Sequence, residues 1–464
     1  MTHSPDGSLP VRLETLLETT LGSPVGQLRA VPVVLGADAP RAFLAVYCAD
    51  FDVDPWVEMF FFPTDTLKMA LITEQGEILW RRDLGRGVVP GMWFCPVLPF
   101  DLDGDGVEEI WYVGNPAADH PLGLSHYRLE RLEARTGERT GLWPWPHYGG
   151  DQSLSHTFRN FLVGGCVQGE PVLVTAQGTY GAMFLQGWRP GMTPRWETRI
   201  GEETPGARGS HMCPIVDIDG DGADELLWGE RCLSLDTGAE RFCADRDVYR
   251  GHSDIVQPVW IQPEGGWRIY TCRESDHAAS PRVVCFDATG RRLWGQVEKG
   301  HIDMGWVARL KDDREHVAMA IRIGHKTCGP DGRFHFDRDE FTFDLRTGEP
   351  YSLPFSVYGT IPADLNGDGC HELVRGLPGQ EGEVLDRRGR SLGSVGGPIA
   401  LAGKFLDHPG EQVLAYHPNG TLRVWGDRNA CDSEAALARY AHPFYRANLR
   451  LTSTGSNLGS LAGV

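Results

Sequence analysis

The sequence predicts an all-β protein, a β-propeller built from blades of four short strands. Gly and Pro are abundant, with 58 and 31 residues among 464, and no stretch between residues 30 and 430 sustains a helical hydrophobic period. Short runs such as EEIWYV, PVLVTA and WRIYTC are apolar or aromatic and are bounded by turn residues, as strands are. Polar turns recur roughly every 50 residues, which is the length of one propeller blade.

The repeat also predicts the domain organisation. Turn anchors near residues 50, 101, 168, 217, 263, 312, 364 and 407 give eight units, or seven blades if one unit is partial. We therefore expect one propeller domain over 28–430, an N-terminal segment over 1–27, and a tail over 431–464 that could supply a closing strand.

Composition limits the partners. The formal net charge of −19 disfavours binding to nucleic acid or to anionic membranes, and no apolar run approaches the ~20 residues that span a bilayer. The start, MTHSPDGSLP, lacks the basic and apolar regions of a leader, so we expect a cytoplasmic protein, although an exported chain whose leader had been removed would look the same. The 11 Cys residues lie mostly singly in strand-like runs, which favours a reducing compartment. The oligomeric state is left open.

Two DxDxDG turns and a matching DxNxDG turn, hereafter grouped with them as DxDxDG turns, lie between strand-like runs and form the clearest motif. Carboxylates two residues apart around a tight Gly turn, with a Glu at position 9, can surround Ca²⁺ with oxygen atoms. The alternative is that Asp and Gly merely form and cap the turn. In either case the role is structural. The predicted calcium ligands are Asp101, Asp103, Asp105 and Glu109; Asp217, Asp219, Asp221 and Glu225; and Asp364, Asn366, Asp368 and Glu372.

A second repeat places histidines on one face. Four consecutive units have a His just before their first strand, namely His156, His211, His252 and His301. The first strand of a propeller blade lines the channel, so these side chains should converge at one mouth.

The same face predicts a zinc site. The runs ELLWGERC and WRIYTC place Cys232 and Cys272 at the ends of strands that return to the mouth beside His211 and His252. Two His and two Cys form a closed tetrahedral site for structural Zn²⁺, and Cys213, Cys243 and His277 are nearby substitutes. The alternative is that these are buried core residues.

Further polar residues belong to this mouth. Tyr180 and His325 occupy strand-end positions that correspond to those of the Cys residues, and His120 and His126 lie in a loop on the same face. Arg195, Arg273 and Arg322 are close in sequence. His, Tyr and Arg together suit proton transfer beside an anion.

The stretches SLSHTFRNF, GTYGAMFLQGW, GHSDIVQP and YTCRESDHAASPR resemble the polysaccharide lyase family 25 ulvan lyases and related propeller lyases, over roughly residues 40–430. The resemblance implies seven blades, a structural zinc, and cleavage of an anionic, often sulfated, ulvan-like polysaccharide or oligosaccharide with rhamnose-uronate linkages by β-elimination. It carries the catalytic Tyr to Tyr180, the Arg to Arg195 and the His pair to His126 and His156, with His120 and His147 as competitors.

The chemistry of β-elimination fits these residue types. The catalyst must neutralise the uronate carboxylate, remove the C5 proton and protonate O4. We expect cations to lower the pKa of Tyr180 so that its phenol acts as base and then as acid, with His126 or His156 as the next candidate base.

Two other functions remain open. One is a non-catalytic calcium-binding propeller, similar to the integrin-type repeat, that binds glycans or proteins. The other is a propeller glycoside hydrolase, for which a carboxylate pair or a lone His at the site would be expected. The uronate epimer, the sulfation pattern, and endo or exo action are not predicted.

Overall fold

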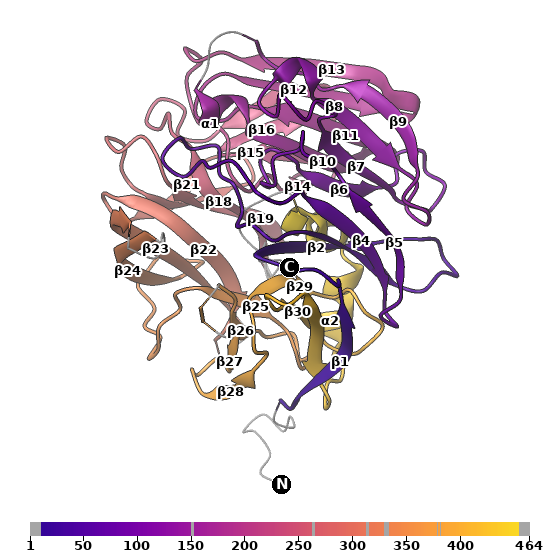
Figure 1. The fold of residues 1–464 in the computed structure, drawn as a ribbon. Helices are drawn as coiled ribbons and strands as arrows, with labels where there is room; N and C mark the ends of the chain where they lie inside the picture. Colours follow the sequence, from indigo (N-terminus) through magenta and orange to yellow (C-terminus); the bar gives the residue numbers. More distant parts are fainter. Residues whose placement is uncertain are drawn as a thin grey trace.

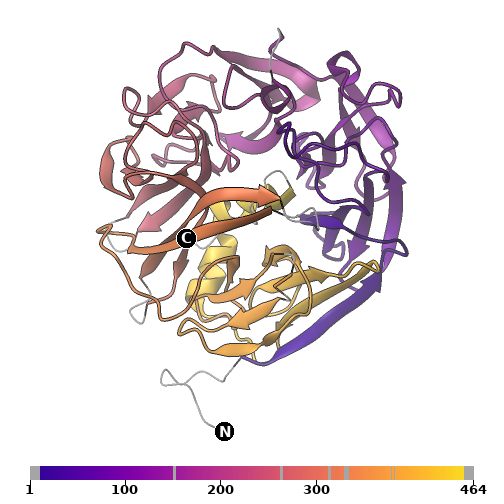
Figure 2. The same cartoon turned by 60° about the vertical axis from the view of Figure 1, so that its left-hand side comes forward.

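The computed structural model describes residues 11–149, 153–261, 265–311, 315–328, 334–377, 379–380 and 382–453. Within them the chain forms eight antiparallel sheets that follow one another around a ring (Figures 1 and 2). The eight repeat units counted from the sequence are therefore confirmed, and the seven blades implied by the family resemblance are wrong. The turns predicted near residues 263 and 312 lie partly outside the described residues.

The first four blades are four-stranded. They contain β2 (Gln27–Val33), β3 (Ala42–Cys48), β4 (Lys68–Thr73) and β5 (Ile78–Asp83); β6 (Val97–Phe100), β7 (Glu109–Gly114), β8 (Arg128–Leu132) and β9 (Arg139–Pro144); β10 (Asn160–Val167), β11 (Glu170–Gln177), β12 (Met183–Arg189) and β13 (Thr193–Ile200); and β14 (Ile215–Val216), β15 (Glu225–Trp228), β16 (Arg231–Ser234) and β17 (Glu240–Cys243).

The next four blades complete the ring. They contain β18 (Ser253–Ile261), β19 (Gly266–Arg273), β20 (Val283–Asp287) and β21 (Arg292–Gln296); β22 (His301–Arg309), β23 (His316–Cys328) and β24 (Phe334–Asp344); β25 (Thr360–Ala363), β26 (Glu372–Arg375), β27 (Glu383–Leu385) and β28 (Ser391–Ser394); and β29 (Ile399–Gly403), β30 (Gln412–Tyr416), β31 (Thr421–Asp427) and β1 (Leu13–Thr20).

The first strand of each blade lies innermost. β2 contacts β6 and β29, and contacts also join β6 to β10, β10 to β14, β18 to β22, β22 to β25 and β25 to β29. Burial follows this order: every residue of the second strand β3 is buried, whereas the outer strand β5 alternates between exposed and half-buried residues. Neighbouring blades cover both faces of the inner strands, so these strands are continuously apolar. Only the outer strands at the rim alternate between apolar and polar residues.

The ring closes through the N-terminus. β1 pairs with β31 in the last blade, so the segment predicted as a separate N-terminal part supplies the closing strand. The tail instead forms α2 (Glu434–Ala441), α3 (Pro443–Asn448) and the 3-10 turn η3 (Leu449–Ser453). η3 contacts β2, β6 and β29, and Asn448 bonds both the N–H and the carbonyl of Ile215. The tail thus packs inside the ring, as Figure 2 shows in yellow.

No helix in the described ranges is long and apolar enough to cross a membrane.

The DxDxDG turns cap themselves. One Asp101 carboxylate oxygen accepts from Gly104 N at 2.7 Å and the other from Gly106 N at 2.8 Å, and Asp217 does the same toward its own turn. Asp101, Asp103 and Asp105 still bring oxygen atoms within 4.8 Å of one another. Calcium in that turn stays a prediction.

Arginines occupy the other two turns. The Arg241 guanidinium binds Asp219 and Glu225, and in the third turn Arg439 of α2 lies 2.7 Å from Asp364. A guanidinium neutralises the same carboxylates that would surround Ca²⁺. Asp217, Asp219 and Glu225 nevertheless bring oxygen atoms within 4.8 Å of one another. The arginine contacts favour the metal-free alternative, and calcium in these two turns also stays a prediction.

This arrangement sets an expected result for Asp217→Ala. The variant should lose about 1 kcal/mol, the scale of a capping side chain, because three turn N–H groups lose their acceptor. The drop in Tm should be equal in calcium and in chelator, because Arg241 already neutralises the turn. Thermal melts in both buffers measure it, and a larger drop in calcium would show that the ion binds there.

Candidate active site

The histidines and the calcium-type turns lie at opposite ends of the blades. Each of the four His residues precedes or begins a first strand, whereas each DxDxDG turn follows one. Each end has a hollow. The one at the His end has a volume of about 940 Å³, and the one at the turn end about 920 Å³.

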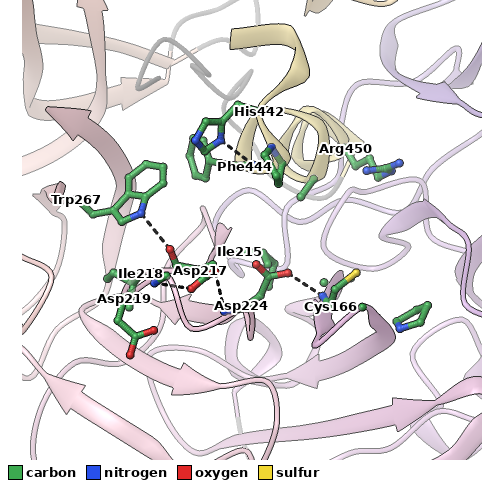
Figure 3. A pocket seen from close by; sticks show the side chains of 18 of the residues that line it. Cys166, Ile215, Asp217, Ile218, Asp219, Asp224, Trp267, His442, Phe444 and Arg450 are labelled. Carbon is green, nitrogen blue, oxygen red and sulfur yellow. Dashed lines mark hydrogen bonds between the residues drawn. The ribbon is translucent and has the colours of Figure 1, made fainter. Parts of the chain in front are cut away.

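The polar groups that line the hollow at the turn end are engaged in contacts that hold the fold together. Asp224 accepts from Cys166 N at 2.7 Å, and the indole of Trp267 donates to the Asp217 carbonyl at 3.0 Å (Figure 3). Arg450 of the tail is paired with Glu108. Its acidic groups are thus used to hold turns and the tail, and we place the candidate active site at the other end.

The cleft at the His end is lined by loops from several blades. Blade 1 contributes the loop 54–59, blade 3 the helix α1 (Leu154–Thr157), and blade 6 residues of β22 and β23. The charged or polar lining residues are Asp54, Glu58, Ser153, Ser155, His156, Arg159, Tyr180, His211, Asp254, Glu274, His301, Asp303, His325 and Lys326. Trp56, Met59, Trp93 and Met304 add apolar surface.

The four predicted histidines do converge. The rings of His211 and His252 lie 4.4 Å apart, and Tyr180 stacks on His252 at 4.1 Å with 24° between the planes. The ring of His156 lies 6.2 Å from that of Tyr180 and is nearly parallel to it. His301 lines the same cleft. The spacing of the His repeat therefore located this mouth correctly.

Tyr180, which lines the cleft, has an unusual backbone conformation. Its φ is 67°, in the left-handed region, and its N–H donates to Arg208 O at 3.0 Å. Gly181 follows, and a Cβ there would lie 2.5 Å from His156 Nδ1, so only Gly allows His156 this close. The phenol oxygen lies 3.3 Å from His211 Nε2.

The environment of Tyr180 differs from the expectation. Burial raises the pKa of the phenol well above its usual value, and the carboxylates of Glu274 and Asp254 raise it further, whereas Arg159 opposes them. This direction is opposite to the expected lowering. The pKa of His156 is lowered, chiefly by burial, which keeps its imidazole neutral near pH 7.

The predicted arginine lies elsewhere. Arg195 is in β13, the outermost strand of blade 3, where it pairs with Glu170 at 2.6 Å and with Asp236. The family Arg assigned to it is thus not in the cleft, because an outer strand faces the rim. Arg273 is buried against Glu230, and Arg322 pairs with Asp339.

Arg159 is the arginine of the cleft. Its guanidinium lies 5.3 Å from the Tyr180 ring and 5.2 Å from the Trp93 ring, and Nη2 is 3.1 Å from Asp54 Oδ1. Its side chain is 5% exposed, and Nη1 has no hydrogen-bond partner among the described residues. A buried N–H donor without an acceptor is costly, so this atom is available to a ligand.

His120 and His126 do not enter the cleft. Their rings stack on each other at 5.8 Å and line a separate hollow of about 570 Å³ with Phe62. Asn115 donates to the His120 carbonyl, and His126 ends the short turn η1 (Leu124–His126), so the loop folds on itself. His147 is not among the residues that line the cleft. Of the predicted His candidates for catalysis, the structure brings only His156 to Tyr180.

Of the predicted zinc ligands, the two histidines lie together and the two cysteines do not. No sulfur atom in the described chain belongs to a group of three or more ligand atoms within 4.8 Å of one another. The reason is local: β15 ends at Trp228, a turn follows, and Cys232 lies in β16 with its side chain in the core. Cys272 packs in another cluster, where its thiol contacts the Tyr270 hydroxyl. The predicted Cys₂His₂ set does not fit.

Several residues that line the cleft were not predicted from the sequence. Arg159 lies three residues after His156, and Asp254 and Glu274 each lie two residues after a predicted ligand. That proximity was the only signal for them. Lys326 directly follows the predicted His325, so the same signal applies to it. Trp56 gave none, because it meets Lys326 from another blade, at 5.9 Å.

Comparisons with known proteins agree with this architecture. The rhamnogalacturonan exolyase YesX and the rhamnogalacturonan endolyase YesW of Bacillus subtilis (strain 168) are 28% and 26% identical to this chain. Each match covers 51% of this chain, but only 43% and 42% of the relatives, so the matched part spans less than half of their length. No protein-family model matches the chain.

Solved structures share the fold. The exotype rhamnogalacturonan lyase YesX has a TM-score of 0.75 at 20% identity over 98% of this chain, and YesW one of 0.73 at 17% over 98%. The Bacillus licheniformis rhamnogalacturonan lyase PL11 has a TM-score of 0.75 at 20% over 99%. In each case 79% of the other chain is covered. These relatives are named for rhamnogalacturonan and not for ulvan, so they do not support membership of family 25.

Proposed function

We propose that this chain is a polysaccharide lyase that cleaves a pectin-type polymer of rhamnose and galacturonate by β-elimination. The observation that carries the proposal is the meeting of a phenol, a neutral imidazole and an unpartnered arginine N–H in one cleft, at Tyr180, His156 and Arg159. The names of the sequence relatives support the same chemistry and replace ulvan with rhamnogalacturonan as the favoured substrate.

Arg159 is proposed to neutralise the uronate carboxylate. Abstraction of the C5 proton leaves negative charge that spreads onto this group, so a buried cation facing it lowers the barrier. Asp54 holds one side of the guanidinium and leaves Nη1 free for the substrate. Lys326, which also lines the cleft, supplies a second positive charge.

Two groups are proposed to divide the proton transfers. In a galacturonate the C5 hydrogen and O4 lie on opposite faces of the ring, so the base and the acid are best placed on different residues. The neutral His156 accepts the C5 proton, the C4–O4 bond breaks as the C4–C5 double bond forms, and the protonated phenol of Tyr180 donates to O4. Solvent then returns a proton to Tyr180 and removes one from His156.

The deciding experiment is an absorbance assay of the unsaturated uronate. Purified chain is incubated with the rhamnogalacturonan backbone, homogalacturonan and ulvan. We expect the band to grow on rhamnogalacturonan, and a faster rate on ulvan would restore the original substrate. New reducing ends without absorbance would identify a glycoside hydrolase, and neither signal from a folded protein that still binds the polymer would identify a glycan-binding propeller.

A further inference from the structure

Three residues that line the cleft, together with the buried His252, form a group that could hold a cation. His211, His252, Asp254 and Glu274 bring one ligand atom each within 4.8 Å of one another. They come from the chain before β14, the start of β18 and the end of β19, so two neighbouring blades supply them. This is the same His pair that the sequence assigned to zinc, with two carboxylates where the two thiolates were expected.

Several atoms of this group lack hydrogen-bond partners. His252 Nε2, Asp254 Oδ1 and Glu274 Oε2 are buried and have none among the described residues. The side chains of His252 and Asp254 are 0% and 4% exposed. Buried acceptors without a donor cost free energy, and three that face one another indicate a missing positive partner.

The hydrogen bonds around His252 fix which ring nitrogen is free. Thr179 Oγ1 donates its proton to the Arg208 carbonyl at 2.6 Å, so toward His252 Nδ1, at 2.5 Å, it can only accept. Nδ1 therefore carries the hydrogen, and Nε2 directs a lone pair into the group. Metal-binding imidazoles are commonly oriented in this way by a bond on the other nitrogen.

A neighbouring group is already satisfied. His301 Nε2 lies 3.1 Å from Asp303 Oδ1 and 3.5 Å from Glu274 Oε1, so it pairs with Asp303 and with the Glu274 oxygen that is not free. Arg159, the nearest guanidinium, is bound to Asp54. Neither offers a cation in hydrogen-bond contact with the free oxygens of Asp254 and Glu274.

We propose that His211, His252, Asp254 and Glu274 bind one divalent transition-metal ion of the Zn²⁺ class in place of the predicted Cys₂His₂ zinc. Two imidazole nitrogens favour such an ion over Ca²⁺ or Mg²⁺, and two carboxylates balance its charge. His211, Asp254 and Glu274 line the cleft, so the ion lies at the substrate side and not in a closed structural site. The proposal does not depend on the lyase reaction.

Metal binding would also order the cleft. Tyr180 stacks on His252 at 4.1 Å, and its hydroxyl lies 3.3 Å from His211 Nε2. An ion that fixes both imidazoles therefore fixes the surface against which Tyr180 packs. His252 is in this sense a positioning residue for Tyr180.

The test is zinc binding to the full chain, without substrate. After treatment with a chelator and dialysis, we expect one equivalent of Zn²⁺ to bind by calorimetry and elemental analysis, with a rise in Tm. Glu274→Gln and His252→Gln should weaken binding by more than the ~10–100-fold that loss of an outer partner costs. Cys232→Ala and Cys272→Ala are the matched controls and should bind as the unmodified chain does.

An absorption spectrum of the unmodified chain with bound Co²⁺ tests the ligands without any variant, so the test still works if a variant fails to fold. With Co²⁺ in place of zinc, nitrogen and oxygen ligands give only weak visible bands, whereas thiolate ligands add a strong sulfur-to-cobalt band in the near ultraviolet. That ultraviolet band, loss of zinc in Cys272→Ala with retention in Glu274→Gln, or no zinc binding by the folded chain would each overturn the proposal. A zinc-binding chain without lyase activity would instead refute only the proposed function.

Discussion

Tyr180→Phe should lower kcat by at least ~10²-fold, the usual contribution of a general acid or base. The variant removes only the hydroxyl that would protonate O4. Phe and Tyr have the same backbone preferences, so the cost of the left-handed φ at this position is unchanged, and the ring still stacks on His252. Tm should stay close to that of the unmodified chain.

Steady-state rates from the unsaturated-uronate absorbance, with thermal melts, measure this effect. Tyr148→Phe is the matched control, because Tyr148 also loses only a hydroxyl and does not line the cleft in the part of the chain that the structure describes. A folded Tyr180→Phe protein that still makes product at near the original rate would remove Tyr180 from the reaction. Under the division of roles proposed here, His156→Gln should also lose kcat, through loss of the base.

Arg159→Ala should lower kcat/KM by at least ~30-fold. Truncating one partner of a buried, hydrogen-bonded charge pair costs about 2–5 kcal/mol, and each ~1.4 kcal/mol is a factor of ten. The loss should fall on both kcat and KM, because the carboxylate is bound in the ground state and more strongly as charge develops on it. Arg159→Lys should recover part of the activity by restoring the charge without the second N–H.

Arg195→Ala is the matched control for Arg159. Its guanidinium pairs with Glu170 and Asp236 at the rim of blade 3, so we expect kcat/KM to change by no more than about twofold. A circular dichroism spectrum and a melt check that Arg159→Ala remains folded although Asp54 loses its partner. If Arg195→Ala lost activity and Arg159→Ala kept it, the original assignment from sequence would be restored.

The zinc site illustrates how a short local error changes a predicted site. The run ELLWGERC reads as one strand that ends at Cys232, but the strand ends at Trp228 and the chain turns through Gly229. Side chains alternate between the two faces of a strand, so a misplaced end moves a residue from the mouth to the core. The His residues were placed correctly because each is anchored to the start of a first strand.

The sequence by itself determined the architecture and the face at which the histidines meet. Eight turn units, short apolar runs and the His repeat are properties of the local chain, and local turn and strand preferences act the same way in every blade. From these followed a propeller of eight repeat units and the mouth at which His156, His211, His252 and His301 meet.

Only the tertiary structure decided which of many charged residues belong to the site. Arg159 is held by Asp54, 105 residues away, and Lys326 meets Trp56 from a blade on another side of the ring. The closing strand β1 pairs with β31 across nearly the whole chain. Such contacts depend on how the blades close into a ring. The spacing of two residues along the chain does not determine the distance between them in the folded ring. Arg195 was a reasonable choice by sequence, yet its outer strand carries it to the rim.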